Sequence, residues 1–246
     1  MEIQNYMDDL GRQVAVLTWG YKNIKDKVIE KKEYKDDYWL GLLYTEASKI
    51  VDENNEYENE IRSILKKMEE GNNEYSELSL KLVDKAVNGQ LETASRMNIF
   101  YDLLIWEKDI VKSGLFKEAL NRMLQSPKVF KIEEGPDSNC IVVDMSSFGK
   151  IYETLKKSYK IIVRSDNIST YTGKDIAFQM WKFGLAHANL KFHIFSKQKN
   201  NKILWETNNK GEQNEKFGHA NKVVNVVGYE QKFPQQVVYH ALKIMG

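Results

Sequence analysis

Hydrophobic residues in the first half of the chain recur at the spacing of helices. Stripes of apolar side chains three and four residues apart run through 3–17, 38–51, 57–68, 78–87, 91–111 and 115–124. Gly20, Gly71, Gly89 and Gly114 follow four of these stripes, and Pro127 follows the last one. Because this spacing puts the apolar side chains on one face of a helix, the pattern predicts six helices before residue 127.

The pattern after Pro127 mixes strands with helices. Alternating or short apolar runs predict strands over 128–133, 139–145, 190–196, 203–207 and 223–227. Helices are expected over 146–159, from Thr172 (with Asp175 three residues on, as in a capping box) and from Pro234 to Met245, and 160–164 is ambiguous. The sequence therefore predicts a mainly α fold, a helical bundle with a small β-hairpin or sheet element in its C-terminal half (α+β).

Composition narrows the class of protein. The chain has 246 residues, 42% of them hydrophobic, which is enough to build a core. Its one cysteine, Cys140, excludes an internal disulfide and a zinc site with several cysteines. The sequence shows no signal peptide and no apolar run of transmembrane length, so we expect a cytoplasmic protein without a membrane partner. Phosphate-loop and dinucleotide fingerprints are missing, and we expect neither a metal nor another cofactor.

Charge is distributed unevenly along the chain. Residues 1–127 carry 18 Lys and Arg against 24 Asp and Glu, whereas residues 128–246 carry 18 against 11. We therefore divide the chain into an acidic helical region, 1–127, and a basic α+β region, 128–246. The basic region is expected to meet an anion, for which nucleic acid is the usual candidate.

The segment from Lys182 to Phe192 combines groups that could act on RNA. His187 ends an amphipathic helix, Lys182 precedes it by five residues, and Asn189 follows it by two. An imidazole can act as a general acid or base, an ammonium can stabilise charge on a phosphate, and an amide can donate to a phosphate or a 2′-hydroxyl. On an ideal helix Lys182 and His187 lie about 140° apart, so they converge only where the helix ends between them or where two chains meet.

The segment 185–192, followed by a hairpin, resembles the end of a HEPN domain. That family is α-helical, and its signature is an Arg, often followed by Asn, four to six residues before a His. Many members are dimeric, metal-independent ribonucleases of microbial defence or toxin systems. The resemblance implies a catalytic set of Lys182, His187 and Asn189, with Lys182 in place of the Arg and Phe183 in place of the Asn. Lysine keeps the charge but loses the planar fork of arginine, so the resemblance leaves catalysis open.

The expected hairpin carries a second candidate site. Lysines cluster along it and along the loop that follows, and aromatic residues interleave with them: Lys191, Lys197, Lys199, Lys202, Lys210, Lys216 and Lys222, with Phe192, Phe195 and Trp205. Positive charge attracts phosphates and flat rings stack on unpaired bases, so we expect Lys191, Lys197, Lys199, Lys202 and Trp205 to bind nucleic acid.

Three functions stay open on the sequence alone. The first is an RNA-directed HEPN-like protein, a homodimer whose enzymatic form would be a metal-independent endoribonuclease. The second is a non-enzymatic, nucleocapsid-like protein that binds single-stranded nucleic acid. The third is an adaptor whose acidic N-terminal half binds a protein partner.

Overall fold

The computed structural model describes residues 1–149, 157–208, 211 and 217–245. These residues form two compact units, one of Met1–Lys108 with His193–Asn208, the other of Asp109–Phe192 with Asn209–Gly246. The halves predicted from charge, 1–127 and 128–246, are a different division, and that division stays a prediction.

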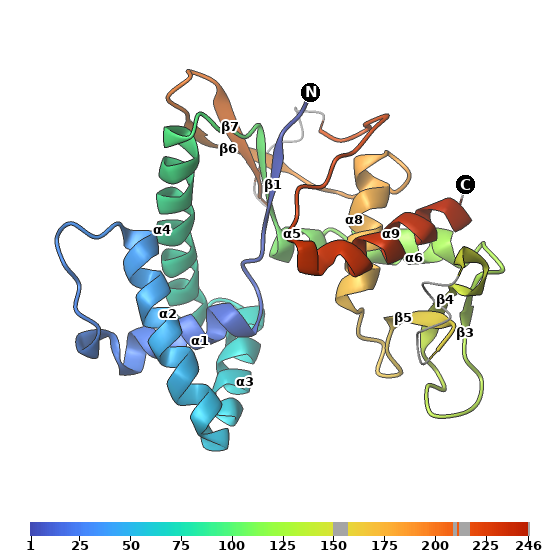
Figure 1. The fold of residues 1–246 in the computed structure, drawn as a ribbon, viewed down its shortest axis with the longest axis horizontal. Helices are drawn as coiled ribbons and strands as arrows, with labels where there is room; N and C mark the ends of the chain where they lie inside the picture. The colour runs from blue at the N-terminus through green and yellow to red at the C-terminus, as the bar shows by residue number, and fades with distance from the viewer. Residues whose placement is uncertain (150–156, 209–210, 212–216, 246) are drawn as a thin grey trace. The chain divides into compact units, whose positions relative to one another are not determined.

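The first unit combines a sheet with a set of helices (Figure 1). Its elements are β1 (Gln4–Met7), α1 (Arg12–Asn23), the 3-10 turn η1 (Lys25–Lys27), α2 (Asp36–Glu53), α3 (Asn55–Glu70), α4 (Glu74–Arg96), β2 (Leu103–Trp106), β6 (Phe192–Lys197) and β7 (Ile203–Thr207). The strand order is β1-β2-β7-β6. β1 runs parallel to β2, with Gln4 opposite Leu103, and β2 runs parallel to β7.

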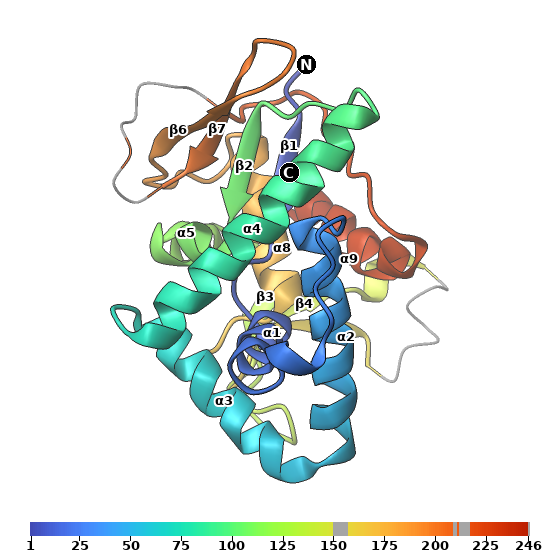
Figure 2. The same ribbon diagram turned by 90° about the vertical axis from the view of Figure 1, so that its left-hand side faces the viewer.

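Two apolar clusters hold the first unit together. Helices α1 to α4 share a core that includes Val16, Leu43, Ile61 and Leu82 (Figure 2). The sheet packs on α4 through a second cluster of Met7, Val87, Leu104, Trp106 and Leu204. Since buried apolar area stabilises at about 25 cal/mol per Å², these clusters fix the sheet to the helices.

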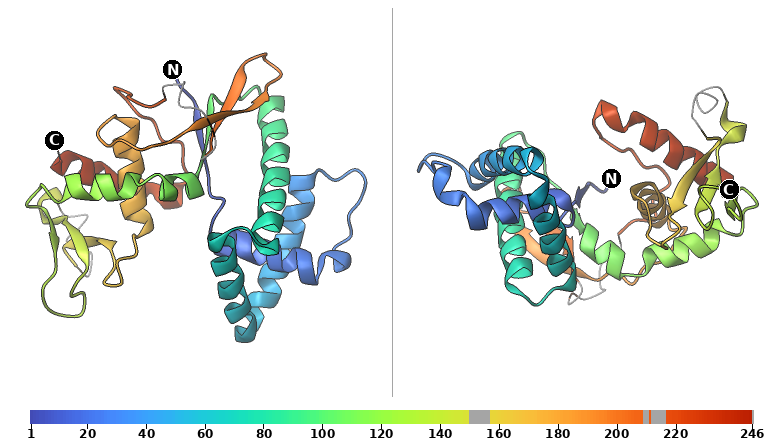
Figure 3. Two further views of the ribbon diagram at one scale, coloured as in Figure 1. Left: turned by 180° about the vertical axis from the view of Figure 1, so that it is seen from behind. Right: turned by 90° about the horizontal axis from the view of Figure 1, so that it is seen from below.

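The second unit is built around helix α8. Its elements are α6 (Leu115–Met123), β3 (Val129–Lys131), β4 (Ile141–Asp144), the 3-10 turn η2 (Ser146–Phe148), β5 (Tyr159–Val163), α8 (Tyr171–Lys182), the 3-10 turn η3 (Tyr229–Gln231) and α9 (Lys232–Ile244). β3, β4 and β5 form an antiparallel sheet in that order. Helix α5 (Glu107–Lys112) carries the chain from the first unit into the second (Figure 3).

The prediction of a mainly α fold was wrong, because the first unit contains a largely parallel sheet with helices packed on it, an α/β arrangement. Strand β1 lies within the predicted helix 3–17, and β2 lies within the predicted helix 91–111. All four residues of β2 are buried, so its apolar run has neither helical nor alternating periodicity to identify it.

Most other elements lie close to their predicted positions, and three details differ. Helices α2, α3 and α6 and strand β7 confirm the predicted segments, and the ambiguous 160–164 is largely strand β5. Helix α4 continues through Gly89, α8 is capped by Thr170 and not by Thr172, and the predicted strand 223–227 forms no strand in the described structure. The predicted helix 146–159 begins as η2, and 150–156 lie outside the described residues.

Candidate functional site

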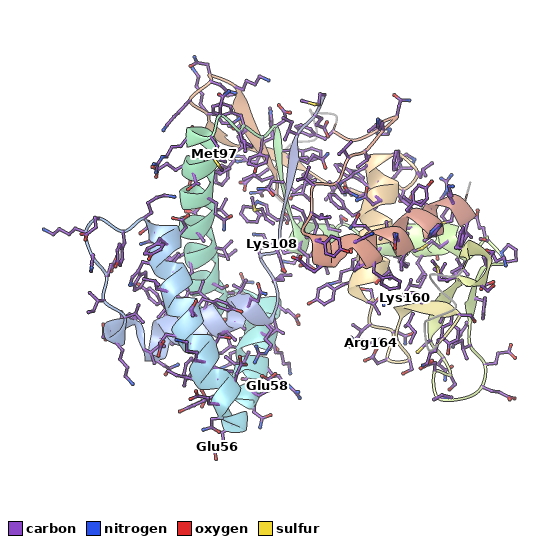
Figure 4. All side chains as sticks on the ribbon, viewed as in Figure 1. Glu56, Glu58, Met97, Lys108, Lys160 and Arg164 are labelled. Carbon is purple, nitrogen blue, oxygen red and sulfur yellow. The ribbon has the colours of Figure 1, made fainter. Side chains whose placement is uncertain are left out.

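Charged side chains follow the carboxyl ends of β1 and β2 in the first unit. Asp9 is 4% exposed, and its Oδ1 accepts a hydrogen bond from the backbone N–H of Lys108 at 3.1 Å. The ammonium of Lys108, labelled in Figure 4, lies 2.9 Å from Asp9 Oδ2. A buried carboxylate is costly unless it is paired, so this ion pair ties the ends of the two strands to each other.

A cavity of about 350 Å³ opens beside the same strand ends. The lining combines three aromatic rings, amide side chains and an apolar floor, from Asn5, Tyr6, Met7, Asp8, Gln13, Val14, Leu17, Tyr44, Val83, Ala86, Val87, Gln90 and Trp106. Open α/β sheets bind ligands outside the carboxyl ends of their strands, which makes this cavity a candidate ligand site. Its lining contains no lysine or arginine, so it suits a neutral or cationic group better than a phosphate.

Helix α8 positions a polar face in the second unit. The Thr170 side chain caps the helix by accepting a hydrogen bond from Gly173 N–H at 3.2 Å. A Cβ at Gly173 would lie 2.6 Å from the carbonyl oxygen of Ile162, so glycine allows the helix to begin directly against β5. From that start, Asp175, Gln179 and Lys182 follow at spacings of four and three residues, which places all three on one face of the helix.

Burial changes the acidity of Lys182. Its ammonium lies 4.3 Å from the centre of the Phe178 ring and 3.4 Å from Asn225 Oδ1. Loss of hydration lowers the pKa of Lys182 to about 8, an effect that the negative charge of Asp175 partly opposes. The side chain is therefore still mostly charged at neutral pH but titrates just above it.

An amide network contacts this face of α8 at Gln179 and Lys182. Gln179 Nε2 donates to Asn225 Oδ1 at 3.2 Å, and Asn225 Nδ2 donates to Gln235 Oε1 at 2.7 Å. The backbone N–H of Ala220 donates to the carbonyl oxygen of Lys182 at 2.8 Å. The segment after residue 217 and helix α9 are thus held beside the end of α8, and Lys182 lies half-buried next to them.

The structure places Lys182 and His187 in different surroundings. Helix α8 ends at Lys182, and Gly184 has a φ of 71°, so the helix does end between the two residues. Within the described ranges, however, no hydrogen bond or ion pair joins their side chains. His187 is exposed, and its backbone N–H donates to Glu118 Oε1 at 2.8 Å. Asn189 is exposed in the segment that follows.

The predicted nucleic-acid residues lie mostly on the hairpin of β6 and β7. Lys197, Lys199 and Lys202 are exposed around its turn, and Trp205 is half-buried on β7. Lys191 is half-buried in the second unit, just before β6, and the exposed Lys222 also belongs to that unit. Lys210 and Lys216 lie outside the described residues.

Sequence reasoning missed the strand ends and gave Asp175 only a capping role. The pair Asp8-Asp9 after a four-residue strand is the signal that marks the first site, but it is visible only once β1 is recognised. Asp175, Gln179 and Lys182 could have been recognised from their helical spacing alone.

Comparison with known proteins decides the family. The model described as "tRNA synthetases class I (R), catalytic domain" matches residues 2–205. This chain belongs to that family. An arginine–tRNA ligase of Thermococcus kodakarensis is 40% identical over 100% of this chain and 39% of its own length, and one of Deinococcus radiodurans is 35% identical over the same shares. The chain therefore spans about two fifths of the curated relatives it matches.

A solved structure agrees with this assignment to the class I synthetases. The arginyl-tRNA synthetase of Thermus thermophilus superposes with a TM-score of 0.80 at 31% identity, over 100% of this chain and 39% of that one. A structure from Campylobacter jejuni described as a putative arginyl-tRNA synthetase gives a TM-score of 0.56 at 14% identity, which supports the fold alone.

The membership corrects the expected function. The resemblance to HEPN domains was wrong, and so were the ribonuclease, defence, nucleocapsid and adaptor functions, because the synthetase model accounts for residues 2–205 whereas the HEPN match was sharp over 185–192 alone. A lysine before a helix end and a histidine after it are a short pattern that unrelated folds share. The role in RNA cleavage expected of Lys182, His187 and Asn189 is withdrawn with that function, and a functional role of these three residues stays a prediction.

Proposed function

We propose that this chain is a segment of an arginine–tRNA ligase and takes part in joining arginine to tRNA. The match of the family model over residues 2–205 carries the proposal, and relatives named arginine–tRNA ligase at 40% identity support it. The RNA partner is then a tRNA. A homodimer, a protein partner for the acidic half and a cytoplasmic location stay predictions. Among the described helices, none has the length and apolar character needed to cross a bilayer.

The polar face of α8 offers a place for the amino acid. Free arginine carries a guanidinium at one end and a carboxylate at the other. Asp175 and Lys182 carry the complementary charges seven residues apart, about 10 Å along the helix at 1.5 Å per residue. A half-buried carboxylate is the preferred partner of a guanidinium, and Gln179 lies between the two charges with an amide that can donate and accept. We therefore place the guanidinium at Asp175 and the carboxylate at Lys182.

Binding of arginine analogues by the chain tests this placement. Calorimetry would compare arginine with citrulline, which lacks the guanidinium charge, and with agmatine, which lacks the carboxylate. Wild type should prefer arginine over both. Asp175→Asn should lose the preference over citrulline and keep that over agmatine, and Lys182→Met should do the reverse. Equal affinity of wild type for all three compounds would contradict the placement.

A chimera tests the activity itself. This chain would replace the matching segment of the Thermococcus kodakarensis ligase, and transfer of labelled arginine to tRNA would be measured. Transfer by the chimera supports the proposal. A chimera that melts at the temperature of the intact ligase but transfers no arginine would refute it.

A further inference from the structure

The turn of the β6–β7 hairpin presents three lysines on an ordered frame. Lys197 ends β6, Lys199 lies in the turn and Lys202 precedes β7, and all three are exposed. Backbone hydrogen bonds of 2.9 Å run from Gln198 N–H to the Lys202 carbonyl and from Asn201 N–H to the Gln198 carbonyl. Asn201 has a φ of 66°, a left-handed conformation that asparagine tolerates well. The three lysine side chains therefore project from a turn whose backbone conformation is fixed by hydrogen bonds.

The turn of the hairpin is fixed to the rest of the first unit through Gln198. Gln198 Nε2 donates to the Tyr101 carbonyl at 2.8 Å, and Tyr101 N–H donates back to Gln198 Oε1 at 3.2 Å. Strand β7 continues the parallel sheet beside β2. Figures 1 and 2 both show the turn at the far end of the hairpin from helix α3. Because the turn is already ordered, binding a ligand there loses little conformational entropy of the backbone.

Negative charge that could neutralise the lysines is scarce along the hairpin. Glu206 is the one acidic residue in 193–207. Its Oε2 accepts a hydrogen bond from Trp106 Nε1 at 2.7 Å, and its Oε1 lies 3.7 Å from His193 Nδ1. Among the described residues, no ion pair involves Lys197, Lys199 or Lys202. The turn thus carries three positive charges close together and no negative charge.

We propose that the hairpin turn, Lys197–Lys202, binds the phosphate backbone of the tRNA. The inference rests on the proposed function for the identity of the polyanion and deepens it by naming the contact surface. The turn suits phosphates because it presents ammonium groups and the amides of Asn200 and Asn201, with no apolar residue among them, whereas the amide of Gln198 is bonded to Tyr101. An acidic polypeptide is the other class of partner that such a charge attracts, and the experiment separates the two.

The test is the salt dependence of tRNA binding by two matched triple variants. The first replaces Lys197, Lys199 and Lys202 with Gln. The second is the control and replaces Lys49, Lys66 and Lys85 with Gln, three exposed helix lysines of the same unit that lie within 3.9 Å of an acidic partner. Both variants lose three positive charges, so they differ in the position of the lysines and in whether an acidic residue pairs with them.

Fluorescence anisotropy with labelled tRNA between 50 and 300 mM NaCl should separate the variants. Each lost phosphate contact lowers the slope of log K against log salt by about 0.7–0.9, so the hairpin variant should lose about 2 from the slope and bind about 100-fold more weakly at 0.1 M salt. The control variant should stay within about twofold of wild type.

Three results would overturn the inference. The first is that wild type does not bind tRNA at 50 mM NaCl, and the second is that wild type and the hairpin variant have equal slopes. The third is that the hairpin variant loses as much affinity for poly-L-glutamate as for tRNA. Arginine binding by the hairpin variant is measured in parallel. Normal arginine binding with unchanged tRNA binding refutes the hairpin contact alone, whereas absent arginine preference with the expected tRNA result refutes the proposed function alone.

Discussion

The pKa of Lys182 predicts an unusual dependence of stability on pH. In the folded protein this pKa is about 8, compared with 10.5 for an unburied lysine. Between these values the unfolded chain holds the proton and the folded chain does not, so the free energy of unfolding must rise with pH. At about 1.4 kcal/mol per pK unit, the gain between pH 7 and pH 10 is about 2–3 kcal/mol.

Lys182→Met removes the titrating group and keeps an aliphatic side chain of similar length. Urea unfolding followed by circular dichroism at pH 7, 8, 9 and 10 would give the difference in stability between wild type and variant. That difference should shift in favour of wild type by about 2–3 kcal/mol as the pH rises. Lys222→Met, at an exposed position in the same unit, is the control for loss of one charge. A difference for Lys182→Met that stays within about 0.5 kcal/mol over this range would refute the burial argument.

Two further predictions concern close packing and a paired carboxylate. Gly89→Ala should cost about 1–3 kcal/mol in urea unfolding, because a Cβ there would lie 2.6 Å from Asp37, whereas Gly41→Ala, with open space around it, should gain up to about 1 kcal/mol. Hydrogen bonds from Ser146 and the ammonium of Lys128 lower the pKa of Asp144 to about 2, so Asp144 contributes up to about 2 kcal/mol above pH 4 that disappears as the pH falls to 2. Acid titration of Asp144→Asn against wild type would show the two stabilities converging in that range, and a constant difference would contradict the pairing.

Some parts of the fold could be predicted because their causes are local. The stripes in 38–51 and 57–68 need only the neighbours three and four residues away, and they became α2 and α3. The turn in 197–202 likewise follows from polar residues between two apolar runs, and the exposed lysines around it follow from the same pattern.

The parallel sheet could not be predicted in this way. Gln4 pairs with Leu103, nearly a hundred residues along the chain, so neither β1 nor β2 has a local partner that its sequence could indicate. The role of Gly89 could not be predicted locally either. The sequence pattern predicts a helix end there, whereas in the structure the missing Cβ allows Asp37 to approach α4. A residue's long-range neighbours decide its role in both cases.

What the sequence determined by itself was helices such as α2 and α3, the hairpin and the uneven charge, because periodicity and composition are properties of the chain alone. Only the tertiary structure decided that the first unit is built on a parallel sheet and that Lys182 titrates near pH 8. Strand pairing and desolvation both depend on groups that folding brings together from distant positions, and no local pattern encodes them.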